Sequence, residues 1–213
     1  MNKKKISLWV NVFLIIAEIV GFVMVINESG FAFVKYYTQA SNIILLIAAT
    51  LYVIHYFKSC KNGTEELPYY VGLLKYIASC VVLVTFIVVV TVLAPTRADQ
   101  GANAVMNVIF GGSNLFHHIL CPLICVISYV FLDENICITR KENLLATFPT
   151  FLYAAITLSL NIAKIMEGPY IFLYVYEQSV FMSIFWIIAI VGGGFVVAFL
   201  LGLVINRNHK KGI

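Results

Sequence analysis

Two polar stretches in this otherwise apolar chain carry side chains that could do chemistry. The first holds Thr38, Ser41 and Asn42, at the start of a long apolar segment. Spacings of three and four residues place the three polar groups on one face of a helix. Such a face of a membrane helix must turn towards the bundle interior or a water-filled cleft. Hydrogen bonding between helices is one explanation of it, and a hydroxyl nucleophile is the other.

The second stretch runs from Asn114 to Pro122 and contains a pair of histidines. Pro122 cannot donate the backbone hydrogen bond to the carbonyl of His118, so we expect the helix to kink or loosen there. His117 points about 100° away from the polar stripe that contains His118, which makes His118 the candidate for the bundle interior. The predicted interior stripe has steps of four, three, four and three residues, and comprises Asn114, His118, Cys121, Cys125 and Ser128.

Thr38 and His118 are the two parts of a nucleophile and base pair. Both are predicted in the outer half of the membrane, because Thr38 begins its helix and His118 lies about 9 Å into its own by the helical rise. The imidazole would accept the hydroxyl proton during attack on an acyl carbonyl. Asn42 and Asn114, each four residues from one of the two reacting groups, could donate hydrogen bonds to the developing oxyanion.

Glu18 is a lone carboxyl group within the first apolar segment. An uncompensated buried carboxylate costs several kcal/mol, so the group needs a partner or a proton. Three roles stay open: orienting His118, binding a polar group of a substrate, or forming structural hydrogen bonds as a neutral acid.

The composition indicates that membrane-spanning helices position these residues. The chain has 213 residues, of which 62% are hydrophobic and 11% charged, with the apolar residues in long blocks. This pattern excludes an ordinary soluble fold and predicts an all-α polytopic membrane protein, a single domain over residues 1–213. The six predicted transmembrane helices cover residues 6–26, 38–57, 70–93, 112–132, 144–162 and 180–206, and a polar loop is expected over 94–107.

Loop charges predict the orientation of the six-helix bundle. Ten lysines and arginines fall on one side of it and three, Lys35, Arg97 and Lys164, on the other. By the positive-inside rule, both termini are expected to be cytoplasmic. The net charge of +4 is therefore a topology signal and does not indicate nucleic-acid binding. The glycine triplet at 192–194 favours close packing of the last helix.

The sequence predicts no metal and no cofactor. None of the five cysteines has the spacing of a zinc site or a secreted disulfide framework. A haem shared by His55 and His118 is excluded because the two residues are expected near opposite membrane faces. A small membrane transporter or lipid-binding protein that uses the same polar outer-half cleft is the alternative to an enzyme, although no inverted repeat is visible.

The motifs Tyr37-Thr38-x-x-Ser41-Asn42 and His118-x-x-x-Pro122, with Gly168-Pro169-Tyr170-Ile171-Phe172, carry a resemblance to a known family. The chain resembles the androgen-induced-gene type of intramembrane threonine hydrolases, which include hydrolases of fatty acid esters of hydroxy fatty acids, and their bacterial relatives of unassigned substrate. The resemblance implies that Thr38 is the nucleophile and His118 its partner. The doublet of His117 and His118 departs from the family pattern, and the helical stripe favours His118.

The partners that the resemblance implies are a lipid or fatty-acyl ester substrate and the surrounding membrane lipids. Lysine, asparagine and isoleucine usage indicates a bacterium, and hence a multi-pass protein of the bacterial plasma membrane. Hydrolysis and acyl transfer both stay open at this point, as do the chain length of the substrate and the oligomeric state.

Overall fold

The computed structural model describes residues 2–62 and 67–211, and all regular structure in these ranges is helical. The longer helices of this part are α1 (Lys3–Ser29), α2 (Tyr37–Asn62), α3 (Tyr69–Val88), α4 (Ala102–Phe110), α5 (Cys121–Phe131), α6 (Arg140–Ile162), α7 (Val180–Ile187) and α8 (Gly193–Lys211). Short 3-10 segments lie at Gly30–Lys35, Pro95–Gln100 and Ile171–Leu173, and π-helical turns at Val89–Leu93, Leu115–Leu120 and Ile188–Gly192.

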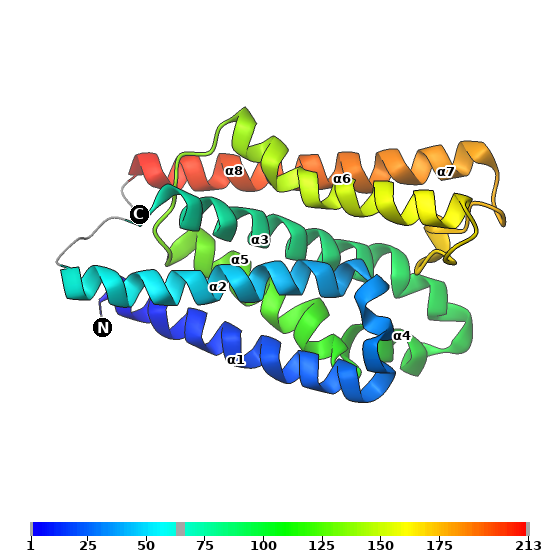
Figure 1. Cartoon of the computed structure of the whole chain (residues 1–213), viewed down its shortest axis with the longest axis horizontal. Helices are drawn as coiled ribbons and strands as arrows, with labels where there is room; N and C mark the ends of the chain where they lie inside the picture. Colours follow the sequence, from blue (N-terminus) through cyan, green and yellow to red (C-terminus); the bar gives the residue numbers. More distant parts are fainter. Residues whose placement is uncertain (1, 63–66, 212–213) are drawn as a thin grey trace.

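Five helical segments are long and apolar enough to cross a membrane, and a bent pair raises the number to six. The bent pair consists of α4 and the segment Leu115–Phe131, which meet at an angle of 72°. The all-helical prediction is confirmed, and the expected six spans correspond to the upper count. The start of α1 and the end of α8 lie at the same end of the bundle (Figure 1).

The expected polar loop at 94–107 is wrong, because that region is largely helical. It forms the 3-10 segment Pro95–Gln100 and then most of α4. The residues of α4 include Ala102, Ala104 and Met106, which are strong helix formers. Asn103 and Asn107 in the same stretch masked this propensity in the sequence.

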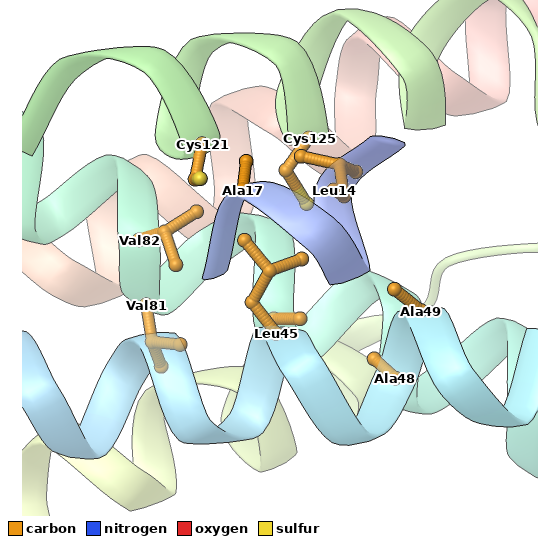
Figure 2. Close-up of a cluster of buried hydrophobic side chains, with 10 residues drawn as sticks. Leu14, Ala17, Leu45, Ala48, Ala49, Val81, Val82, Cys121 and Cys125 are labelled. Carbon is orange, nitrogen blue, oxygen red and sulfur yellow. The ribbon is translucent and has the colours of Figure 1, made fainter. Parts of the chain in front are cut away.

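Helix α3 is the centre of the bundle. It runs between α1 and α2 on one side and α6 and α8 on the other (Figure 1), and it contacts α2, α5, α6 and α8. Because partners surround it, its sequence is apolar on nearly every face. One cluster of its core packs alanines and thiols between α1, α2, α3 and α5, which lets these helices approach closely. Figure 2 shows most of this cluster, which comprises Leu14, Ala17, Leu45, Ala48, Ala49, Ala78, Val81, Val82, Cys121 and Cys125.

Local sequence signals explain where several helices begin. Asn2 accepts a hydrogen bond from the backbone of Lys4 and caps α1. Thr139 and Glu142 form a reciprocal capping box at the start of α6. These caps satisfy backbone groups that a helix end leaves without partners.

The glycine triplet does not pack as the sequence suggested. Open space surrounds the positions where side chains of Gly192 and Gly193 would begin. Gly194 has only ordinary contacts there, with Thr150 and Val84. The tight approach of α8 lies instead at Gly202, where an added Cβ would be 2.8 Å from a methyl carbon of Ile138.

Candidate active site

The site begins at the bend between α4 and the following helix. Gly112 has a φ of +53° there, a conformation that side chains other than glycine rarely adopt. The chain then enters the π-helical turn Leu115–Leu120, which ends with the amide of Cys121 bonded to the carbonyl of Phe116. The loosening expected before Pro122 is therefore confirmed.

Asn42 satisfies the carbonyl that Pro122 leaves free. In a π-helical turn the amide bonds to the carbonyl five residues earlier, so the missing donor of Pro122 frees the carbonyl of His117. The Asn42 side chain donates to that carbonyl at 3.1 Å and to the carbonyl of Thr38 at 2.7 Å. Both amide hydrogens are engaged, so the expected role of Asn42 as an oxyanion donor is wrong. It links α2 to the π-helical turn instead.

The π-helical turn also reverses the expected positions of the two histidines, because His117 faces the bundle interior and His118 does not. His117 is 1% exposed and shares the buried face with Cys121, Cys125 and Ser128. His118 is only half-buried and lies on another face. The predicted stripe is wrong at its outer end because a π turn holds more residues than an α turn, which changes the phase before Cys121.

Thr38 and His118 nevertheless line the same cleft, of about 330 Å³. Asn114 lines it too, and its side chain donates one hydrogen bond to the carbonyl of Asn107 at 3.1 Å, which leaves its second amide hydrogen available. The cleft lies among the ends of α1 and α2, the Pro95–Gln100 segment and residues 169–174.

The ring of His118 is held in the tautomer that a general base needs. Its Nδ1 lies 2.8 Å from the carbonyl oxygen of Val108. A carbonyl only accepts, so Nδ1 carries the hydrogen and Nε2 keeps a free lone pair in the neutral ring. The bond also fixes the orientation of the imidazole on the cleft wall.

Tyr170 is a functional candidate to which the sequence pattern assigned no individual role. Its hydroxyl accepts a hydrogen bond of 3.3 Å from the backbone amide of Thr38, and its ring stacks on Phe172 with centroids 5.0 Å apart. Burial raises the pKa of the Tyr170 phenol, although the bonds from Thr38 act in the opposite direction. The phenol therefore stays neutral and keeps an O–H donor beside Thr38. Its position in the motif at 168–172 was the sequence signal that could have identified it.

An apolar pocket adjoins the other side of Thr38. Thr38, Leu93 and Tyr170 line both this pocket and the polar cleft, so they form the partition between the two. The remaining walls come from α3, α6 and α7 and are mainly Val, Leu, Ile and aromatic side chains. A narrow volume of about 40 Å³ is open within it. A hydroxyl group thus lies where a polar and an apolar compartment meet.

Ser41 is buried behind Thr38 and does not line either space. Its hydroxyl bonds to the carbonyl of Thr38 at 2.8 Å and to the hydroxyl of Thr85 at 2.9 Å. This supports the structural explanation of Ser41, as a link between α2 and α3.

Glu18 faces His117 and not His118. Its Oε2 lies 3.4 Å from Nε2 of His117, and both side chains are almost completely buried. Gly21 leaves the room for the imidazole, since an added Cβ would collide with it, and Phe22 packs against the ring at 4.7 Å. Glu18 does not line the cleft, so it does not bind substrate there. It contributes to the site only through the neighbour of His118.

A second buried polar cluster, far from the cleft along the bundle, was missed by the sequence reasoning. Lys75 of α3 lies 3.0 Å from Asp133 Oδ2 and donates to Asn11 at 2.6 Å. Asp133 Oδ1 accepts from Ser7 at 2.5 Å and from Ser128 at 2.9 Å. Lys75 is the one charged residue of the predicted span 70–93, and that was the signal which could have found it.

Within residues 2–62 and 67–211, no group of three or more His, Cys, Asp or Glu side chains gathers as a metal site. Comparison with protein-family models, curated proteins and solved structures finds no match for this chain.

Proposed function

We propose that this protein is an intramembrane hydrolase of lipid-like carboxylic esters, with Thr38 as nucleophile and His118 as base. The observation that carries the proposal is the shared cleft, which is lined both by Thr38 and by His118, whose Nδ1 is bonded to the Val108 carbonyl. The resemblance to intramembrane threonine hydrolases supports the same assignment.

The proposed reaction uses groups that the cleft already holds. Nε2 of His118 takes the hydroxyl proton as Oγ1 of Thr38 attacks the acyl carbonyl. The oxyanion receives hydrogen bonds from the Tyr170 hydroxyl and from the remaining amide hydrogen of Asn114. The protonated imidazole then gives its proton to the departing alcohol, and water activated by the same imidazole releases the acyl group from Thr38.

The two compartments favour an amphipathic substrate such as a fatty acid ester of a hydroxy fatty acid. Its acyl chain would enter the apolar pocket and its polar part the cleft, with the ester bond at Thr38. Among the described residues that line the cleft, Arg97 has no ion-pair partner, whereas Glu28 accepts hydrogen bonds from Ser113. A long chain requires α7 to move outward, and none of the residues of α7 is buried.

The proposal places the cleft in the outer half of a bacterial plasma membrane. It assumes six spans with both termini cytoplasmic, which the loop charges favour. The position of the start of α1 and the end of α8 at one end of the bundle supports an even number of spans (Figure 1).

The test is the reaction of purified variants with a fluorophosphonate probe and with a series of fatty-acyl esters. Thr38→Ala removes the attacking oxygen, so labelling and turnover should vanish while the thermal unfolding temperature stays near that of the wild type. Thr38→Ser keeps the oxygen and should retain partial activity. Ser41→Ala is the matched control, because its hydroxyl is one turn away but bonded within the bundle, so it should keep most activity.

Two results would refute the assignment. An active Thr38→Ala variant with an inactive Ser41→Ala variant would show that Ser41, one turn away, is the nucleophile. Equal behaviour of all variants on every ester would remove the hydrolase proposal and favour the alternative, a small transporter or lipid-binding protein that uses the same cleft.

A further inference from the structure

A groove separate from the cleft lies at the other end of the bundle, between the start of α6 and the end of α8. Its volume is about 470 Å³. One wall is a stripe on α8 formed by Phe195, Phe199, Leu203 and Asn206. Gly202 lies on the same wall and has no side chain to fill the space. Phe199 and Leu203 are about half exposed, so the groove opens to the surroundings of the bundle.

The length of the groove matches one leaflet of a bilayer. The eleven-residue step from Phe195 to Asn206 spans about 16 Å by the helical rise. Half of a hydrocarbon core of about 30 Å is nearly the same distance. Asn206 lies near the end of the apolar span Val180–Asn208, so the groove reaches from the membrane surface towards the midplane.

Arg140 gives the surface end of the groove a positive charge. It lines the groove, is exposed, and has no ion-pair partner among residues 2–62 and 67–211. Glu142 does not line the groove, and its carboxylate accepts hydrogen bonds from Thr139 and Tyr69. The side chain of Asn206 accepts one hydrogen bond from the backbone of Ile138 and donates one to it.

Two other polar residues of the groove form hydrogen bonds within the protein. Asn143 accepts a bond of 2.6 Å from the Tyr76 hydroxyl, and the Thr139 hydroxyl bonds to Glu142. Arg140 is therefore the charged donor left for an occupant. A guanidinium at the interface above a leaflet-long apolar groove complements a phosphate with an acyl chain beneath it.

We propose that this groove binds one anionic phospholipid of the leaflet next to the chain ends. The phosphate bonds to Arg140 and one acyl chain lies along Phe199 and Leu203. Such a lipid fills the space between α6 and α8, so it stabilises the bundle by binding the folded state. The site is independent of the proposed hydrolase activity.

The test measures thermal unfolding of the detergent-purified protein with added phosphatidylglycerol, or with phosphatidylcholine of the same chains. Phosphatidylglycerol should raise the unfolding temperature and phosphatidylcholine should not. Arg140→Gln should weaken the apparent affinity for phosphatidylglycerol about tenfold, as expected for the loss of one charge-assisted contact. Lys141→Gln is the matched control, since Lys141 is the next cation in the chain but does not line the groove, and it should behave as the wild type.

A second pair of variants tests the chain-binding part. Leu203→Trp fills the groove and should abolish the shift, whereas Leu200→Trp, on an equally exposed part of α8 outside the groove, should keep it. Equal losses for Arg140→Gln and Lys141→Gln would mean diffuse electrostatic attraction and overturn the proposal. A shift given equally by phosphatidylcholine or by oleate would also overturn it. So would a second copy of this chain that covers the groove and that added phosphatidylglycerol does not displace.

Discussion

At the residue scale, the central feature is that two adjacent histidines have different surroundings. His118 lines the cleft with a free Nε2, while His117 is buried against Glu18 and Phe22. Adjacent residues can have such different surroundings because side chains along a helix point in different directions. Removal of the two rings should therefore affect different properties of the protein.

Alanine at each position separates function from stability. His118→Ala should abolish probe labelling and ester turnover with little change in unfolding temperature, because the proposed base is lost from a half-buried position. His117→Ala should destabilise the protein by about 2–3 kcal/mol, because it opens a cavity beside Phe22 and the buried Glu18 carboxyl group. Activity assays and thermal unfolding measured on the same samples check both effects, and equal loss of activity with unchanged stability in both variants would contradict this division.

Gly21 and Gly192 offer a matched pair of substitutions. Gly21→Ala should destabilise by about 1–3 kcal/mol, because the new methyl group collides with the buried His117 ring. Gly192→Ala should leave stability unchanged or raise it by up to about 1 kcal/mol, since open space surrounds that position. Thermal unfolding in one detergent decides the comparison, and a Gly21→Ala variant as stable as Gly192→Ala would show that the His117 pocket is not tightly packed.

At the scale of elements, polar side chains determine how the helices are joined. Asn42 ties α2 to the carbonyl of His117, and Ser41 ties α2 to α3 through Thr85. The Lys75 and Asp133 pair connects α3 to the end of α5, with Asn11 of α1 as a further partner. Buried polar groups of this kind favour one arrangement of apolar helices that could otherwise pack in several ways.

The ion pair predicts that a second substitution, at Asp133, restores part of the stability lost by a substitution of Lys75. Lys75→Met should destabilise the bundle by about 3–5 kcal/mol, because it leaves the Asp133 carboxylate buried without its cation. Adding Asp133→Leu should recover part of that loss, because it removes the unpaired carboxylate, although Ser128 and Asn11 lose an acceptor. Unfolding temperatures of the single and double variants give the measurement, and a double variant less stable than Lys75→Met would contradict the expectation.

At the scale of the whole molecule, the exposed cysteines report the topology without any substitution. Cys60 and Cys137 are exposed, whereas Cys80, Cys121 and Cys125 are buried. Cys60 lines a pocket with Asn2 at the start of α1, and Cys137 precedes Ile138, which bonds to Asn206 of α8. Both thiols therefore lie at the end of the bundle that holds the chain ends.

A membrane-impermeant maleimide should label Cys60 and Cys137 in inside-out vesicles and neither one in right-side-out vesicles. An Asp99→Cys variant should show the opposite pattern, because the Pro95–Gln100 segment is expected on the outer side. Mass spectrometry of the labelled peptides makes the measurement. Labelling of Cys60 and Cys137 from opposite faces would refute the six-span arrangement.

The sequence alone determined those features that depend on local chemistry. Long apolar blocks require helices in a bilayer, because each backbone polar group must find its partner within the segment. A proline in a helix must release a carbonyl, so the loosening before Pro122 followed from one residue type. The positions of Thr38 and His118 near the starts of their predicted helices also followed from chain position and helical rise, and the structure brings both to one cleft.

Only the tertiary structure decided which polar groups were already engaged. The buried position of His117 depends on a π-helical turn, which changes the helical phase in a way that a fixed 100° step cannot predict. Asn42 lost its expected role because its partner is the carbonyl of a residue 75 positions away, and Lys75 meets Asp133 for the same kind of reason. Contacts between distant residues arise when helices pack, and neither composition nor periodicity encodes which partners then meet.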